Sequence, residues 1–151
     1  EVDTVKVNAQ GKWTYQPTAN LSEGLNVITA TATDAAGNVS PVSGVYSITI
    51  DTIPPAKPDV PLITDNVLPV AGNVASGGTT NDTTPTFSGK GEPGSTITIY
   101  NNGSEIGQTT VGDNGSWTFT PSPLDPDTTY VITTTETDIA GNTSSFIGRS
   151  P

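Results

Sequence analysis

The sequence contains no cysteine and no histidine. Without cysteine, the chain forms no disulfide and offers no thiolate to a metal ion. Without histidine, it lacks the commonest general base and the commonest zinc ligand. Oxygen atoms of carboxylates, amides and the backbone are therefore the ligands that remain for a metal ion.

Basic residues are also scarce. Five Lys and Arg stand against 15 Asp and Glu, and the formal net charge is −10. This balance argues against nucleic acid and against insertion into, or binding to, an anionic membrane. Two interpretations of the acidity stay open: it keeps a secreted protein soluble, or it provides hard oxygen ligands for a cation such as calcium.

Long apolar runs and long runs of helix formers are missing as well. No segment approaches the roughly 20 apolar residues of a membrane-spanning helix, and runs of Ala, Leu, Glu and Lys are absent. The 16 Gly and 13 Pro fall between short runs rich in Thr, Val and Ile, a pattern typical of many β-strands and turns. No signal peptide opens the chain, and because it begins at Glu1 rather than Met we expect it to be an excerpt of a longer protein.

An internal repeat dominates what is present. Residues 7–17 (VNAQGKWTYQP) match residues 111–121 (VGDNGSWTFTP). Residues 27–40 (VITATATDAAGNVS) match residues 131–144 (VITTTETDIAGNTS). Residue 7 matches 111 and residue 27 matches 131, an offset of 104 in both cases, so one ungapped register covers both pairs. Chance does not produce such a match, and the chain therefore contains two copies of one module.

The length of the repeat indicates the fold. An offset of 104 residues is close to the roughly 100 residues of an immunoglobulin-like sandwich and too long for ankyrin, tetratricopeptide or leucine-rich repeats. Residues 51–58 (DTIPPAKP) contain three prolines, which predict a short, semi-rigid linker. We predict an all-β chain of tandem immunoglobulin-like β-sandwich repeats in an elongated array, with the C-terminal half of one repeat at 1–53 and a second, nearly complete repeat at 54–151.

Alternating patterns predict seven strands in the second copy. They cover about 59–64, 85–91, 96–100, 105–111, 116–120, 129–137 and 145–149. A long connection rich in Gly, Thr and Asn joins the first two, over residues 65–84. The alternation places one set of side chains on an inward face: Ile97, Ile99, Trp117, Phe119, Tyr130 and Ile132.

The first copy contains only the later strands of the module, at about 2–7, 13–15, 25–33 and 42–50. Half a sandwich cannot cover its own core, so we expect missing residues upstream, a proteolytic fragment or a partner chain that completes it. Trp13 and Trp117 have two interpretations, as core residues or as platforms that stack on sugars. We favour the core for both, because both fall on the inward face.

Three segments together resemble a known family. Residues 31–58 (TATDAAGNVSPVSGVYSITIDTIPPAKP), 80–100 (TNDTTPTFSGKGEPGSTITIY) and 114–121 (NGSWTFTP) resemble the bacterial Ig-like repeats of giant adhesins exported by type I secretion. The resemblance implies a non-enzymatic stalk on the bacterial cell surface. It also implies calcium ions, bound by aspartates near the junctions between neighbouring repeats, that stiffen the rod. Contact with a host cell or matrix would then be made by another part of the protein.

The resemblance implies calcium ligands at acidic positions near the junction. Asp51 ends the last strand of the first copy, Asp138 follows a strand that runs toward the N-terminal end of the second copy, and Glu92 lies in a turn at that end. These residues are expected to converge, with Asn142 and backbone carbonyls completing the about six to eight oxygens that calcium takes. Asp34 is the equivalent of Asp138 in the first copy, and its partners would lie in a preceding repeat.

A second calcium site is predicted at the opposite end of the second copy. Asp65 and Asp82 flank the long connection and are expected to meet the turn that contains Asp125 and Asp127. For every one of these aspartates an alternative stays open, because Asp before Gly-Asn or Thr is a common turn and capping residue that needs no metal. No EF-hand loop of the form D-x-D-x-D-G occurs in the sequence.

Two other functions compete with the stalk. The first is a module that binds a glycan or a host protein directly, which exposed aromatic residues in one loop would favour. The second is an Ig-like accessory domain of a secreted hydrolase. The chain itself is not expected to be an enzyme, because Asp125 and Asp127 flank a single proline with no predicted cleft around them.

Overall fold

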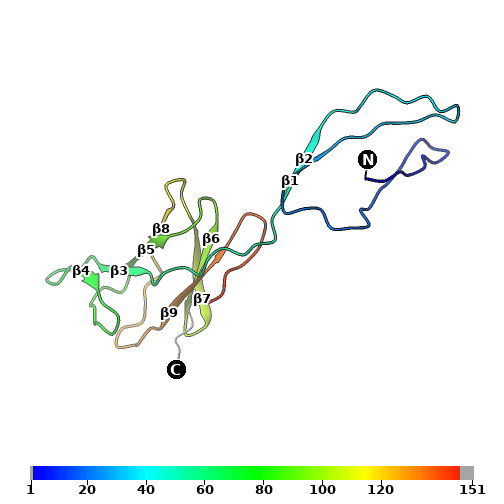
Figure 1. The fold of residues 1–151 in the computed structure, drawn as a ribbon. Coiled ribbons are helices and arrows are strands. Elements are labelled where there is room, and N and C mark those ends of the chain that lie inside the picture. Colours follow the sequence, from blue (N-terminus) through cyan, green and yellow to red (C-terminus); the bar gives the residue numbers. More distant parts are fainter. Residues whose placement is uncertain (1, 147–151) are drawn as a thin grey trace. The chain divides into compact units, whose positions relative to one another are not determined.

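The computed structural model describes residues 2–146 of the 151-residue chain. Every regular secondary-structure element within this range is a β-strand, which confirms the all-β prediction (Figure 1). The chain forms two compact units, Glu1–Asp51 (unit 1) and Thr52–Pro151 (unit 2). The described part of the chain contains no helix that is long and apolar enough to cross a membrane.

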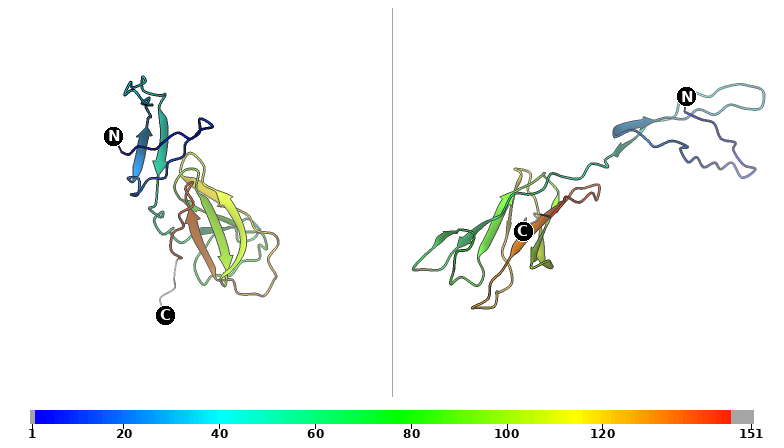
Figure 2. Two further views of the ribbon diagram at one scale, coloured as in Figure 1. Left: turned by 90° about the vertical axis from the view of Figure 1, so that its right-hand side faces the viewer. Right: turned by 60° about the horizontal axis from the view of Figure 1, so that its bottom comes forward.

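Unit 2 is built from two antiparallel sheets (Figures 1 and 2). The first has the strand order β4-β3-β5-β8, and the second has the order β7-β6-β9. Their bounds are β3 (Leu62–Asp65), β4 (Gly72–Val74), β5 (Thr86–Lys90), β6 (Thr96–Asn101), β7 (Ser104–Thr110), β8 (Ser116–Phe119) and β9 (Ile132–Thr137). Strands β5, β6, β7 and β8 lie where the alternation predicts them.

The hairpin between β6 and β7 shows why these strands pair as they do. Asn102 and Gly103 form its two-residue turn, with φ angles of 49° and 83°. Positive φ at both positions matches the right-handed twist of the flanking strands, and Asn-Gly is the pair that adopts it most readily. The turn sets the register in which Tyr100 lies opposite Glu105, and a bulge between Ile99 and Tyr100 then shifts the pairing so that Ile99 lies opposite Gly107.

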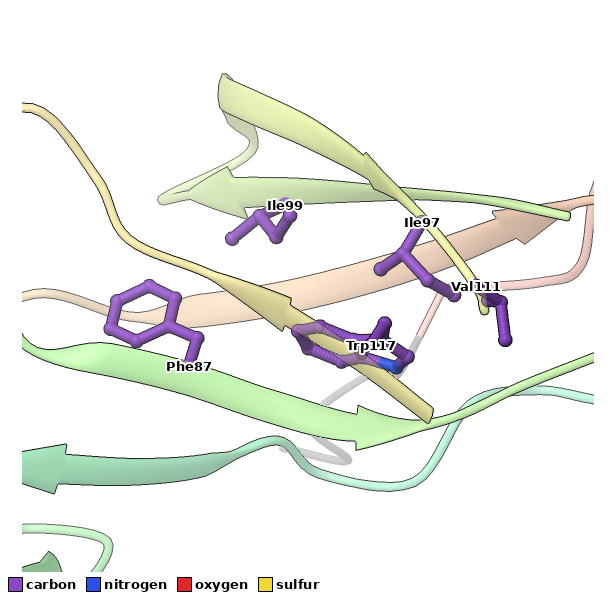
Figure 3. Close-up of a cluster of buried hydrophobic side chains, with 5 residues drawn as sticks. All are labelled: Phe87, Ile97, Ile99, Val111 and Trp117. Atoms are coloured by element: carbon purple, nitrogen blue, oxygen red, sulfur yellow. The ribbon is translucent and has the colours of Figure 1, made fainter. Parts of the chain in front are cut away.

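A small apolar core fills the space between the two sheets (Figure 3). Ile97 and Ile99 are fully buried on β6, as the period-two pattern predicts. Trp117 of β8 and Phe87 of β5 cover them from the other sheet, and Val111 closes one end. The predicted inward residues Phe119, Tyr130 and Ile132 are half-buried.

The side chain of Tyr130 ties the start of β9 to the preceding turn. Its hydroxyl accepts a hydrogen bond from the backbone N–H of Asp125 at 2.7 Å and faces the carbonyl of the same residue at 3.4 Å. A tyrosine that bonds back to the backbone a few residues upstream is the tyrosine corner of immunoglobulin-like sandwiches. Tyr130 therefore supports the immunoglobulin-like class in addition to the two facing sheets.

Strand positions differ from the prediction in three places. The connection 65–84 contains β4, which pairs with β3 so that Ile63 lies opposite Val74. β3 begins at Leu62 rather than 59, because Pro58 and Pro61 have no N–H for a ladder. β9 begins at Ile132 rather than 129. Of the strand predicted at 145–149, residues 147–149 lie outside the described residues.

Residues 2–51, the described part of unit 1, form one strand pair. β1 (Gly24–Ile28) runs antiparallel to β2 (Tyr46–Ile50), and residues 29–45 join them in a long loop (Figures 1 and 2). The strands predicted at 2–7 and 13–15 do not form, so that prediction is wrong. The physical reason is that unit 1 offers these segments no neighbouring strand with which to pair.

The predicted core position of Trp13 is also wrong. Its side chain is 53% exposed, whereas Trp117 is 3% exposed. None of residues 2–51 is buried. A pair of strands has only one layer, and a second layer is needed to remove an apolar face from water.

Candidate functional site

The turn after β9 is held by the side chain of Asp138. Its two carboxylate oxygens accept hydrogen bonds from the backbone N–H and the side-chain amide of Asn142, each at 2.8 Å. The backbone N–H of Asp138 donates to the Asn142 carbonyl at 3.0 Å, and the Gly141 N–H donates to the Asp138 carbonyl at 3.2 Å. Gly141 has a φ of 94°, which a residue with a side chain rarely adopts. The sequence Asp-Ile-Ala-Gly-Asn therefore closes a compact turn.

Unit 1 repeats this turn 104 residues earlier. Asp34 accepts bonds from the backbone N–H of Asn38 at 2.8 Å and from its side-chain amide at 2.9 Å. The Asp34 N–H donates to the Asn38 carbonyl at 3.0 Å, and Gly37 has a φ of 90°. The same local sequence thus produces the same hydrogen-bonded turn, which we call the Asp–Asn turn, in both units.

The Asp–Asn turn favours the ionised form of its carboxylate. The side-chain amide of Asn142 is the main cause that lowers the pKa of Asp138 below the ordinary 3.8, with backbone N–H groups adding to it. The side-chain amide of Asn38 lowers the pKa of Asp34 in the same way. Both side chains therefore keep their negative charge to a lower pH than an ordinary aspartate does. The structure shows the turn-forming role of these aspartates; a bound cation would be an additional role.

A buried glutamate lies beside this turn. Glu136 of β9 is 3% exposed, and its carboxylate accepts hydrogen bonds from the Ser95 hydroxyl and from the Glu92 N–H, the latter at 2.6 Å. The Ser144 hydroxyl accepts a bond from the Glu136 N–H at 2.9 Å. Glu136 therefore joins the turn at Glu92, whose side chain is exposed, to the strand that ends at the Asp–Asn turn.

Sequence reasoning missed Glu136. A signal was present, because residue 136 has the same parity as the inward-facing Ile132 and Thr134, so its side chain points toward the core. A charged side chain at such a position is rarely buried unless it is paired or hydrogen-bonded. The equivalent residue of the first copy is Ala32, so comparison of the two copies does not indicate a buried charge at this position.

Asp65 and Asp82 are connected through Thr80, whose hydroxyl donates to the Asp65 carboxylate and accepts from the Asp82 N–H. Both are nearly buried, at 5% and 6% exposed. Asp65 accepts bonds from the Thr80 hydroxyl at 2.6 Å and the Val67 N–H at 2.7 Å. Asp82 accepts bonds from the N–H groups of Asn66 at 2.9 Å and Thr84 at 2.8 Å. The Asn66 and Thr84 N–H groups lower the pKa of Asp82, and the two carboxylates hold both ends of the connection that contains β4.

The remaining predicted ligands are Asp51, Glu92 and Asp127. Asp127 is exposed in a turn with a φ of 57°. Asp51 follows β2 and belongs to unit 1, whereas Glu92 and Asp138 belong to unit 2, so the predicted junction site stays a prediction. Within residues 2–146, no three Asp or Glu side chains gather closely enough to hold one metal ion.

Two small hollows lie beside the β3–β4 hairpin, and Asp65, Val70 and Thr79 line both of them. Asp65 is the one carboxylate in their walls, and the hydrogen bonds from Val67 and Thr80 already engage it. A hydrolytic site of the two-carboxylate type needs a pair of acids at a set separation. These hollows do not provide such a pair.

The two facing sheets and the tyrosine corner define an immunoglobulin-like β-sandwich. A family model described as the bacterial Ig-like domain matches residues 1–52 and 61–146. The chain belongs to the bacterial Ig-like domain family. Domains of this family are typically non-catalytic and often extracellular. A comparison with curated proteins finds none that matches the chain.

Proposed function

We propose that this chain is a non-enzymatic spacer in the stalk of a bacterial surface adhesin, built from tandem Ig-like repeats. The observation that carries the proposal is the Asp–Asn turn, which recurs with the same hydrogen bonds at Asp34 and Asp138. A spacer gains length by reusing one module, whereas an enzyme or a receptor needs one distinctive site. Neighbouring repeats of the same chain are then its main partners, and a different part of the protein contacts the host cell or matrix.

The linker supports a spacer role. Residues 51–61 contain no strand, and four prolines lie within them: Pro54, Pro55, Pro58 and Pro61. Proline fixes φ near −65°, so this segment has fewer conformations than a Gly/Ser linker of equal length. A linker of this kind transmits the direction of one repeat to the next.

We further propose that calcium stiffens the junction between repeats. The proposed ligands are Asp51, Glu92, Asp138 and Asn142, with Asp34 serving the preceding junction. Two observations support this. Asp138 is ionised at neutral pH, as any aspartate of ordinary pKa is, and its turn lowers its pKa further, so binding requires no proton release. The net charge of −10 also favours a divalent cation over an anionic partner.

Calorimetric titration of the full chain with calcium, together with small-angle scattering in calcium and in chelator, tests this proposal. We expect saturable binding of calcium and a higher melting temperature. In the scattering experiment we expect a narrower distribution of interatomic distances in calcium than in chelator. In Asp51→Ala, calcium should no longer narrow the distribution of interatomic distances, while unit 2 should still unfold cooperatively. Glu105→Gln removes one negative charge at the β6–β7 hairpin and serves as the matched control. Scattering curves that do not respond to calcium would contradict calcium stiffening.

Direct binding of a glycan is the second candidate function. The observation that favours it is the exposure of Trp13, whose indole is accessible to a sugar ring. Retention of the chain on a glycan array, and its loss in Trp13→Ala, would support this alternative. An array without hits would leave the spacer as the function to pursue.

A further inference from the structure

Three prolines of the connection between β2 and β3 are buried, although this connection contains no strand (Figure 1). They are Pro55, Pro58 and Pro61, which stand three residues apart. The residues between them are all exposed, at positions 56, 57, 59 and 60. Burial therefore recurs at every third residue along 55–61.

This period distinguishes between two extended conformations of the backbone. A β-strand turns successive side chains to opposite faces, so a strand that buried Pro55 would also bury residues 57 and 59. A polyproline II helix has three residues per turn, so every third side chain lies on the same face. Because residues 57 and 59 are exposed, the burial pattern is that of a polyproline II helix with one packed face.

The local sequence favours the same conformation. Residues 54–61 read PPAKPDVP, and each proline fixes its own φ at about −65°, close to the value of about −75° in polyproline II. Proline also moves the residue before it out of the α region, which restricts Lys57 and Val60. Within residues 54–61 only Ala56 and Asp59 are neither proline nor followed by proline, so the segment has little freedom to leave this conformation.

The packed face belongs to unit 2. The boundary between the two compact units falls after Asp51, so residues 55–61 lie within unit 2. Pro61 directly precedes β3, which pairs with β5 in the first sheet. The segment therefore enters the sandwich as a packed element and not as a free tether.

We propose that residues 55–61 form a polyproline strap, an integral part of unit 2 that fastens the chain to the sandwich ahead of β3. The three buried prolines hold the strap in place, while the charged side chains of Lys57 and Asp59 stay in water. Tension on the chain ahead of unit 2 then acts on the strap before it reaches β3. The strap goes beyond the spacer function proposed above and does not depend on calcium.

Such a strap depends on the spacing of its prolines as well as on their number. Each residue of a polyproline II helix turns the chain by about a third of a circle. One residue inserted between Pro55 and Pro58 therefore rotates Pro55 away from the face that holds Pro58 and Pro61. The same residue inserted ahead of Pro55 leaves the three prolines in phase, and a free tether would not distinguish between the two insertions.

Scanning calorimetry of the full chain carrying Pro58→Ser tests the strap, with Pro54→Ser as the matched control. Both variants lose one proline of the same connection, so the unfolded chain gains a similar conformational entropy in both. Pro58 is buried, whereas Pro54 is exposed. We expect Pro58→Ser to lower the melting temperature of unit 2 by about 4–8 °C more than Pro54→Ser does. Equal melting temperatures for the two variants would overturn the proposal.

Insertion of a single alanine provides a second test, which leaves every proline in the chain. The alanine follows Ala56 in one variant and lies between Pro54 and Pro55 in the other. We expect the first insertion to lower the melting temperature of unit 2 and the second to leave it unchanged. A similar loss from both insertions, or no loss from either, would overturn the proposal, because neither result depends on the phase of the prolines.

Discussion

Asp138 and Asn142 are joined by three hydrogen bonds, two to the carboxylate and one between backbone groups, and Asp34 and Asn38 repeat all three in unit 1. Asp138→Ala removes both side-chain acceptors and leaves the Asn142 N–H without its partner. We expect a lower melting temperature of unit 2 by differential scanning calorimetry. Asp34→Ala is the matched control and should leave this transition unchanged, because Asp34 belongs to unit 1. Equal melting temperatures for Asp138→Ala and the unsubstituted chain would refute the structural role of the turn.

Acid should weaken unit 2 for a related reason. The folded-state pKa values of Asp82 and Asp138 lie below the ordinary 3.8, so the unfolded chain binds protons at a higher pH than the folded chain does. The stability that these carboxylates contribute is present above the unfolded pKa and is lost as the pH falls through the folded pKa. The melting temperature should therefore fall below about pH 5, and Asp138→Asn should reduce the slope. A melting temperature that rises on acidification would contradict this assignment.

Much of unit 2 could be predicted from sequence because its strands alternate regularly and Asn-Gly turn signals stand at residues 102–103 and 114–115. β4 escaped prediction because a strand of three residues, Gly72–Val74, is too short to alternate. Glu136 escaped because its burial depends on donors far along the chain, from Ser95 and Glu92. The first failure reflects a weak local signal, whereas the second reflects partners that are distant in sequence.

Trp13 shows most clearly that a local sequence pattern does not determine whether a side chain is buried. Residues 13–15 read Trp-Thr-Tyr and residues 117–119 read Trp-Thr-Phe, yet one tryptophan is exposed and the other is buried. Local pattern predicts which face of a strand is apolar, but burial also requires a second layer. The same limit applies to the predicted junction site, whose ligands Asp51 and Asp138 belong to different units.

Removal of the Thr134 hydroxyl should stabilise unit 2, whereas removal of the Ser95 hydroxyl should destabilise it. Thr134 is fully buried, and its hydroxyl has no hydrogen-bond partner among the described residues. Thr134→Val keeps the shape and removes the unsatisfied group, so unit 2 should gain about 1 kcal/mol. Ser95→Ala removes a donor to the buried Glu136 carboxylate and should cost about 1.5–3 kcal/mol. Urea unfolding followed by circular dichroism measures both changes, and destabilisation by Thr134→Val would show that the hydroxyl has a partner.

The two tryptophans provide a test of where the core lies. Trp117→Ala empties a site packed against Phe87, Ile97 and Ile99 and should destabilise unit 2 by about 3–5 kcal/mol. Trp13→Ala changes an exposed side chain and should alter the unfolding of unit 2 by less than about 0.5 kcal/mol. Iodide quenching gives an independent readout, because it should reach Trp13 and not Trp117. Similar costs of both substitutions to unit 2 would contradict the exposed position of Trp13.

Gly107 of β7 lies against the ring of Phe119 of β8. A Cβ added at Gly107 would run into the Phe119 ring, and this ring also packs at 6.1 Å between centroids against Phe87. Gly107→Ala should therefore cost about 1–3 kcal/mol through overpacking. Gly44→Ala is the matched control, because a Cβ there has open space. Phe119→Leu should absorb part of the clash, so the double variant should be more stable than the two single costs predict when added together. Strict additivity in urea unfolding would mean that the cost of Gly107→Ala arises from the backbone and not from the ring.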